Sequence, residues 1–105
     1  IRMNELQLIN KNGVFYADSR QIAAIVGKRH SNLLRDIGRY KEYLTRLKIS
    51  YNNYFIKSSY KIKGNNKTYP CYLISKMGCE FIENKMTGKR GALFTFKYIE
   101  RNGEK

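Results

Sequence analysis

The sequence predicts a single α+β domain in which helices alternate with β-hairpins. The chain has 105 residues and a hydrophobic content of 42%, which suits one small core. Strand-like segments flank two turns that contain Gly and Asn, and a long apolar stripe at helical spacing lies between them. We therefore expect residues 1–105 to form one domain. Because the first residue is Ile1, we expect this segment to be cut from a longer protein.

The first predicted elements are a hairpin and a short helix. Residues 5–9 and 14–17 resemble strands, and the turn between them ends at Gly13, which tolerates a positive φ. Asp18 or Ser19 can cap the helix that follows. Its apolar positions share one face, and Gly27 can end it. These positions are Ile22, Ala23 and Val26.

The strongest helical signal follows a tight link at residues 28–30. We expect Ser31 to cap this helix and Gly38 to serve close helix packing within it. The apolar stripe that faces the core consists of Leu33, Ile37, Tyr40, Leu44 and Leu47, widened by Leu34. The opposite side is charged, with Arg35, Arg39, Glu42 and Arg46.

A second hairpin and two further helices complete the predicted order. Residues 54–63 and 67–74 form the hairpin, in which Pro70 favours an edge position because it lacks a backbone N–H. We expect one helix capped by Ser75, with Met77, Phe81 and Ile82 inward. We expect another helix capped by Thr87, with Ala92, Leu93, Phe96 and Ile99 inward.

This order resembles a winged helix-turn-helix. A short helix, a three-residue link and a longer basic helix form the helix-turn-helix pattern, and the second hairpin follows as the wing. The predicted fold is therefore α+β and winged-helix-like. It has an N-terminal β-hairpin, a second β-hairpin and two C-terminal helices.

The charge of the chain favours a polyanionic partner. Lys and Arg total 21 against 8 Asp and Glu, which gives a net charge of +13. The excess lies in residues 19–79, where Asp36 and Glu42 are the acids. A field of this sign attracts nucleic acid most often, with anionic lipid as the rival. The apolar run at residues 22–26 is far too short to span a membrane, and no secretory signal is visible.

Catalytic and metal-binding patterns are missing from the sequence. There is no P-loop, no G-x-S-x-G and no evident pair of carboxylates. One histidine and two cysteines are too few for a structural zinc site. We expect Cys71 and Cys79 to be reduced and partly buried. We therefore expect no enzyme activity, no cofactor and no metal.

The residues around the second helix suit double-stranded DNA. The N-terminal part of the second helix in a helix-turn-helix meets the bases, where Arg can read guanine and Asn can read adenine. Asn32 and Arg35 are the predicted base readers, with Ser31 as a further candidate. The predicted phosphate contacts are Lys28, Arg29, Arg39, Lys61, Lys63 and Lys67, and His30 is a pH-dependent candidate.

Other interpretations of these residues stay open. Asn32 can instead support the start of the helix, and Asp36 can pair with Arg39 or Lys28 and so reduce the basic face. His30 is more typical of a capping or packed histidine than of a catalyst. Most of the nine tyrosines fit core positions. Tyr51, Tyr54 and Tyr60 have no evident place and could stack on single-stranded nucleic acid.

Four segments in order resemble the phage regulatory protein Rha family. They are residues 18–37, 54–60, 70–80 and 84–101, within a resemblance that covers residues 16–102. The resemblance implies a phage or prophage origin and a DNA-directed regulatory role, with Lys28, His30, Asn32 and Arg35 carried over as candidates. Family members often have a second, C-terminal domain. After Arg101 the sequence Asn-Gly-Glu-Lys departs from the family pattern.

The combined prediction is a DNA-binding regulatory domain that acts in the cytoplasm of a bacterial host, associated with the nucleoid. A homodimer is plausible because regulators commonly pair to read two half-sites. A second hypothesis is an antirepressor-like module whose basic face binds an acidic host or phage protein. RNA or single-strand binding is a third.

Overall fold

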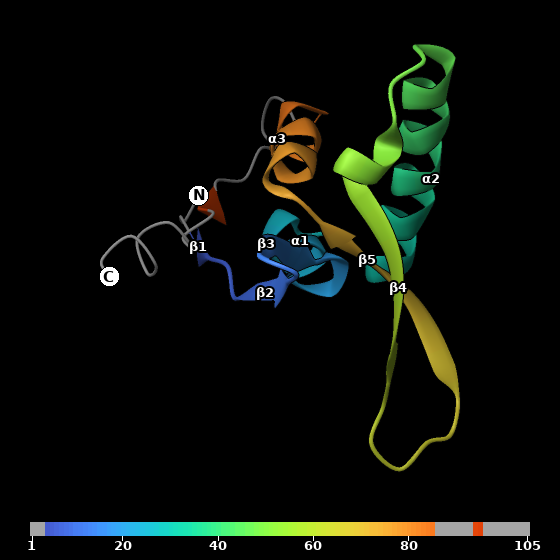
Figure 1. Cartoon of the computed structure of the whole chain (residues 1–105). Helices are drawn as coiled ribbons and strands as arrows, with labels where there is room; N and C mark the ends of the chain where they lie inside the picture. Colours follow the sequence, from blue (N-terminus) through green and yellow to red (C-terminus); the bar gives the residue numbers. More distant parts are fainter. Residues whose placement is uncertain (1–3, 86–93, 96–105) are drawn as a thin grey trace.

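A computed structural model describes residues 4–85 and 94–95 of the chain. Its elements are β1 (Asn4–Glu5), β2 (Leu8–Lys11), β3 (Val14–Asp18), α1 (Ser19–Val26), α2 (His30–Arg46), the 3-10 turn η1 (Tyr51–Asn53), β4 (Phe55–Lys61), β5 (Thr68–Ile74), α3 (Lys76–Lys85) and β6 (Phe94–Thr95). Within the described residues, the predicted α+β class is confirmed as three α-helices with a four-stranded antiparallel sheet (Figure 1).

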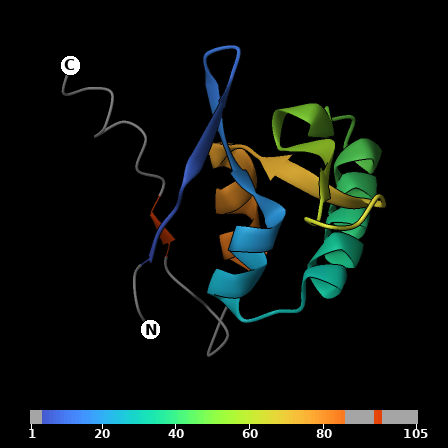
Figure 2. The same ribbon diagram turned by 90° about the horizontal axis from the view of Figure 1, so that it is seen from below.

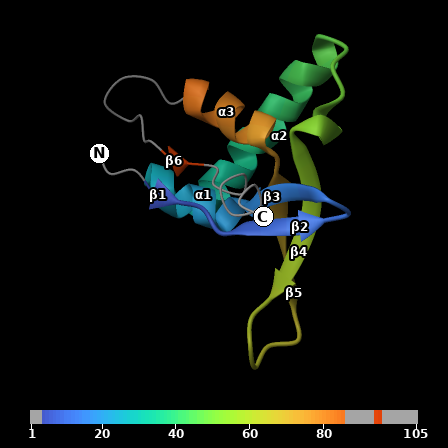
Figure 3. The same cartoon turned by 60° about the vertical axis from the view of Figure 1, so that its left-hand side comes forward.

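The sheet has the order β2-β3-β5-β4. Strand β3 pairs with β5 only through Ala17 and Asp18, whereas β4 and β5 pair along their whole length. The hairpin β4–β5 therefore continues past β3 and projects from the body as a two-stranded ribbon (Figures 1 and 3). Pro70 pairs with Ser59 in this projecting part, where β5 has one neighbour, as predicted for an edge position.

The predicted N-terminal hairpin is present, with its turn at Asn12 and Gly13, both of which have a positive φ. The first predicted strand is divided. Asn4–Glu5 pairs in parallel with Phe94–Thr95, whereas Leu8–Lys11 pairs with β3.

Helix α1 has the predicted ends. The Asp18 side chain accepts the Arg20 N–H at 2.8 Å, and Gly27 closes the helix in the left-handed conformation with φ 75°. The prediction that Ser31 caps α2 is wrong. The Arg29 carbonyl already accepts the N–H of Leu33, so Arg29 occupies the cap position and Ser31 lies in the first turn.

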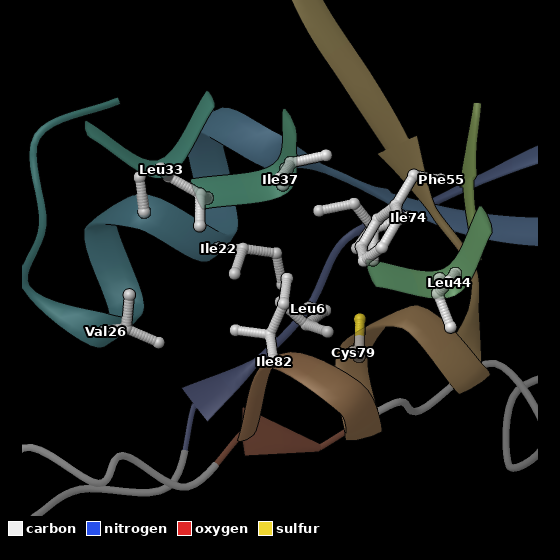
Figure 4. Packing of buried hydrophobic residues seen from close by; sticks show 12 residues of the cluster. Leu6, Ile22, Val26, Leu33, Ile37, Leu44, Phe55, Ile74, Cys79 and Ile82 are labelled. Atoms are coloured by element: carbon white, nitrogen blue, oxygen red, sulfur yellow. The ribbon is translucent and has the colours of Figure 1, made fainter. Parts of the chain in front are cut away.

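The core lies between α1, α2, α3 and one end of the sheet (Figures 2 and 4). Leu33, Ile37 and Leu44 are buried as predicted, and Tyr40 packs against this core. Leu47 is 52% exposed because α2 ends at Arg46, so this inward prediction is wrong. The remaining labelled residues of the cluster are Leu6, Ile22, Val26, Phe55, Ile74, Cys79 and Ile82.

Helix α3 begins as predicted, because the Ser75 hydroxyl accepts the N–H of Gly78 at 3.1 Å. Ile82 is buried and Phe81 packs against the core, but Met77 is 48% exposed and the inward prediction for it is wrong. Cys79, two positions further along, is buried instead. Both predicted thiols, Cys71 and Cys79, are free and buried.

Two helical glycines differ in the space around them. A side-chain carbon at Gly38 would meet no atom within 4 Å, so the prediction of close helix packing there is wrong. At Gly78 such a carbon would overlap the Tyr54 carbonyl oxygen and lie 2.7 Å from Ile74 Cγ2. The close approach that excludes a side chain therefore occurs in α3.

The second predicted C-terminal helix is wrong where the structure describes that part of the chain. Phe94–Thr95 form strand β6, in register with Asn4–Glu5 of β1. An aromatic and a β-branched residue suit a strand, and the pairing depends on a segment some ninety positions away. Thr87, Ala92, Leu93, Phe96 and Ile99 lie outside the described residues.

Candidate nucleic-acid interface

The N-terminal half of α2 presents a polar, basic surface. Arg29, Ser31, Arg35 and Arg39 are exposed, and Asn32 is partly exposed. Leu33 and Ile37 fix the opposite side of the helix in the core. The apolar stripe therefore determines which side of α2 faces solvent, and the predicted base readers lie on or beside that solvent-facing side.

Asn32 and Arg35 are joined to each other. The Arg35 guanidinium donates a hydrogen bond of 2.9 Å to Asn32 Oδ1, one helical turn away. The pairing leaves the Asn32 amide N–H groups and the remaining guanidinium donors free to bind other groups. The two predicted base readers thus form one small polar unit.

Asp36 pairs with two of the predicted phosphate contacts. Its carboxylate is buried and accepts hydrogen bonds from Lys28 Nζ and from the Arg39 guanidinium. The sequence left open which of the two cations Asp36 would meet, and the structure brings both to it. One carboxylate therefore offsets part of the positive charge of these two side chains. The strongest uncompensated charge on this side therefore belongs to Arg29 and Arg35.

The Ser19 hydroxyl joins three elements at the start of α2. Ser19 Oγ accepts the backbone N–H of Tyr72 at 2.9 Å and lies 2.8 Å from His30 Nε2. Ser19 is fully buried, so α1, α2 and β5 meet at one shielded oxygen. His30 is therefore a packed, hydrogen-bonded histidine, which was the simpler of its two interpretations.

A Ser–His contact also occurs in nucleophilic catalysis, where the hydroxyl must reach a substrate. Ser19 Oγ is buried and already occupied by Tyr72, which leaves no path for such a step. Burial lowers the pKa of His30, opposed in part by the nearby Asp18 carboxylate. Burial alone would raise the pKa of Asp18, but hydrogen bonds from Arg20 outweigh it and hold that pKa below its usual value.

The hairpin β4–β5 carries the other predicted contacts. Lys61, Lys63 and Lys67 are exposed at its tip, and residues 43–79 contain no Asp or Glu. Within residues 4–85 and 94–95, the ion pairs involve Asp18 and Asp36 and none reaches a hairpin lysine. The His30 ring lies 6.2 Å from the Tyr60 ring, which places the start of α2 beside the hairpin.

Sequence reasoning missed three basic residues that belong to this surface. The Arg20 guanidinium lies 3.9 Å from the centre of the Tyr60 ring, and Lys41 donates to the Tyr72 hydroxyl at 2.8 Å. Lys57 is exposed on β4. The alternation of β4 and the position of Lys41 beside the apolar stripe were signals for two of them. Nothing local indicated the contact between Arg20 and Tyr60.

The three tyrosines without a predicted place are all packed. Tyr51 and Tyr54 lie against the core, and Tyr54 also meets Phe81 edge to face. Tyr60 stacks on Tyr69 with ring centres 5.6 Å apart, beneath Arg20. These contacts favour a structural role for the tyrosines over base stacking.

Comparisons with known proteins agree with the four segments of resemblance. The pattern of the family described as phage regulatory protein Rha matches residues 17–104. A Bacillus subtilis (strain 168) protein named "SPbeta prophage-derived putative antirepressor protein YoqD" is 38% identical over 96 residues. The match covers 91% of this chain and 38% of that protein. No solved structure matches the chain significantly.

Among the described helices, none has both the length and the apolar character needed to cross a bilayer. The match to the family pattern extends over the helix pair, the hairpin β4–β5 and α3. The chain belongs to the phage regulatory protein Rha family.

Proposed function

We propose that this regulatory domain binds double-stranded DNA, with α2 in the major groove and the hairpin β4–β5 as a wing over the backbone. The observation that carries the proposal is the joint position of two basic surfaces. The start of α2 meets the stem of the hairpin at the Tyr60–His30 contact, and the exposed lysines lie beyond this contact at the hairpin tip. Two adjacent cationic elements suit the alternating phosphates and grooves of a duplex.

The sheet topology supports a winged-helix interpretation. Strand β3 leads directly into α1, and it pairs with β5, the second strand of the hairpin that follows α2. In a winged helix, the strand before the helix pair joins the sheet of the wing in this way. The three-residue link at residues 27–29 and the packing of α1 on α2 agree with a helix-turn-helix.

Within this proposal, Arg35 and Asn32 read bases and Ser31 approaches them. Arg29 and the hairpin lysines bind phosphates, together with Lys57, whereas Arg20 contributes less because Asp18 already pairs with it. Lys28, Arg39 and His30 contribute less, because Asp36 and Ser19 already engage them. We propose that the domain acts without catalysis, in keeping with the burial of Ser19 where it contacts His30. A homodimer would read two half-sites.

The test is fluorescence anisotropy of this fragment with labelled duplex, single-stranded DNA and RNA, from low to physiological salt. We expect duplex binding to be tightest, with a slope of log K against log salt of about −4 to −7, or roughly five to eight phosphates. Arg35→Ala should reduce discrimination between duplex sequences, whereas Arg46→Ala on the same helix should leave it intact. Equal binding of every sequence by the parent, Arg35→Ala and Asn32→Ala would exclude base reading.

A second candidate function is an antirepressor-like module that binds an acidic protein. The observation that favours it is the name of the Bacillus subtilis relative, "putative antirepressor protein". In this case duplex DNA should fail to compete with the protein partner, and no nucleic acid should bind even at low salt. Sedimentation of the fragment alone then tests whether it forms dimers.

A further inference from the structure

The tip of hairpin β4–β5 carries an exposed apolar residue among lysines. Ile62 directly follows β4 and is 49% exposed, whereas Lys61, Lys63 and Lys67 surround it in the sequence. The Ile62 carbonyl accepts the N–H of Asn65 at 3.0 Å, and Gly64 has a φ of 84°. Ile62 therefore begins the tight turn between β4 and β5. This turn lies at the far end of the projecting ribbon (Figure 3).

We propose that β4–β5 is a minor-groove arm whose Ile62 side chain wedges between neighbouring base pairs and kinks the duplex. This rests on the proposed binding of double-stranded DNA. Proteins that bend DNA from the minor groove insert an apolar side chain into a base step, while adjacent cations bind the flanking phosphates. An isoleucine flanked by lysines, with no carboxylate in residues 43–79, has this chemistry.

The reach of the ribbon fits this role. Five paired positions, from Lys57 with Tyr72 to Lys61 with Thr68, extend beyond the last position that β5 shares with β3. At about 3.3 Å per residue they span roughly 17 Å, enough for the tip to pass a sugar–phosphate strand. The minor groove is only about 6 Å wide, so a ribbon tip enters fully where the groove opens. A wedge that unstacks one step opens it.

The arm is ordered by its own contacts. Asn65 binds the Tyr69 hydroxyl through Nδ2 at 3.0 Å and accepts the N–H of Lys67 through Oδ1 at 2.8 Å. Further down, Tyr60 stacks on Tyr69 and Arg20 covers Tyr60. Little conformational freedom remains to be lost on insertion, so the arm is prepared for binding.

The polar residues of the neighbouring helix α2 favour a duplex over a lipid surface as the partner of the arm. The helix whose first residue contacts the stem of the arm carries Arg35 and Asn32, whose hydrogen-bonding groups match base edges. A bilayer would meet one exposed isoleucine and would leave that polar unit unused. On DNA, the wedge predicts a preference for flexible pyrimidine–purine steps at positions that no side chain reads by hydrogen bonds.

The experiment compares the parent fragment with Ile62→Ala and with the matched control Ile49→Ala. Ile49 is 39% exposed in the loop after α2, and it lies outside the hairpin. End-labelled duplexes report bending by resonance energy transfer, and 2-aminopurine at the central step reports unstacking. Anisotropy on intact duplex and on duplex nicked at that step gives the two affinities.

The parent and Ile49→Ala should bend the duplex, raise 2-aminopurine emission and bind the nicked duplex roughly tenfold more tightly, because the nick removes most of the unstacking cost. Ile62→Ala should still bind duplex but should lose the bend and most of that preference. A parent that binds duplex tightly and leaves it straight overturns the wedge alone. Absence of all duplex binding overturns the proposed function as well. Tighter, Ile62-dependent binding to anionic phosphatidylserine vesicles than to duplex would also overturn the wedge.

Discussion

Ser19 Oγ lies 2.8 Å from His30 Nε2 across eleven positions of sequence. Because Ser19 Oγ also accepts the Tyr72 N–H, its own hydrogen is available to a neutral imidazole. Protonation of Nε2 removes that acceptor and places a positive charge near Arg20, which already lowers the pKa of His30. The junction of α1, α2 and β5 is therefore best satisfied when His30 is neutral.

Stability should therefore depend on pH through His30. Burial lowers its pKa in the folded state, so the unfolded chain takes up a proton first as the pH falls. The free energy of unfolding should be constant above the unfolded pKa of about 6.5 and should fall as the pH drops from there to the folded pKa. Urea unfolding between pH 5 and pH 8 measures this dependence.

His30→Gln is the control for the pH dependence, because the chain has one histidine. It should flatten the profile between pH 5 and pH 7. The depressed pKa of Asp18 acts below this window, since its contribution is lost only as the pH falls under its usual value of 3.8. If the free energy of unfolding of His30→Gln depends on pH as in the parent, a group other than His30 causes the dependence.

Ser19→Ala should destabilise the domain by about 1–3 kcal/mol, the usual cost of leaving a buried N–H without its acceptor. The group concerned is the backbone N–H of Tyr72, in the part of β5 that begins the projecting ribbon. Ser59→Ala, at an exposed position of β4, is the matched control and should change stability by less than about 0.5 kcal/mol. If chemical denaturation gives the same loss of stability for Ser19→Ala and Ser59→Ala, the stabilising role of the Ser19 hydroxyl is contradicted.

Gly78→Ala and Gly38→Ala should have opposite effects. At Gly78 the added carbon meets the Tyr54 carbonyl oxygen and Ile74, which should cost about 1–3 kcal/mol or more because backbone must move. At Gly38 the space is open and the position is helical, so alanine should stabilise the domain by up to about 1 kcal/mol. Thermal unfolding of the two variants tests the pair. Destabilisation by Gly38→Ala would indicate packing that the structure does not contain.

Asp36→Asn should weaken folding and strengthen duplex binding. Loss of the carboxylate leaves Lys28 and Arg39 without their shared partner, which should cost roughly 1 kcal/mol because the Arg39 end is well exposed. The released cations can then reach phosphates, and each added contact should steepen the salt slope by about 0.9.

Glu42→Gln is the control for this change, because it removes one exposed acid from the same helix without freeing those two cations. Salt titrations of duplex binding compare the two variants. Identical slopes would show that Asp36 does not restrain the basic face.

The sequence predicted the elements whose signals are local. Asp18 and Gly27 bound α1, and the turns of both hairpins contain residues that favour a positive φ. The prediction failed where the secondary structure or burial of a residue depends on a segment far away in the sequence. Phe94–Thr95 forms a strand because it pairs with β1. In α3 the prediction puts Met77 in the core, whereas the structure buries Cys79 there.

The candidate site was predictable as a set of residue types but not as a set of contacts. Arg35, Asn32 and the hairpin lysines stand out by charge and helical position alone. The contacts of Ser19 with Tyr72 and of Arg20 with Tyr60 join residues that are more than thirty positions apart. No periodicity encodes such a pairing, since it depends on how α1 docks against the ribbon.

The first turn of α1 determines how far the hairpin tip stands from the solvent face of α2. Ser19 and Arg20, neighbours in that turn, contact His30 of α2, Tyr72 of β5 and Tyr60 of β4. These contacts therefore hold α2 and the hairpin β4–β5 at a fixed distance from each other. A ligand that contacts both α2 and the hairpin has to present its binding groups at that distance. The spacing of groups along the ligand therefore contributes to selectivity. Relatives with different residues in this turn would select ligands with a different spacing, although the contacting side chains are of the same kind.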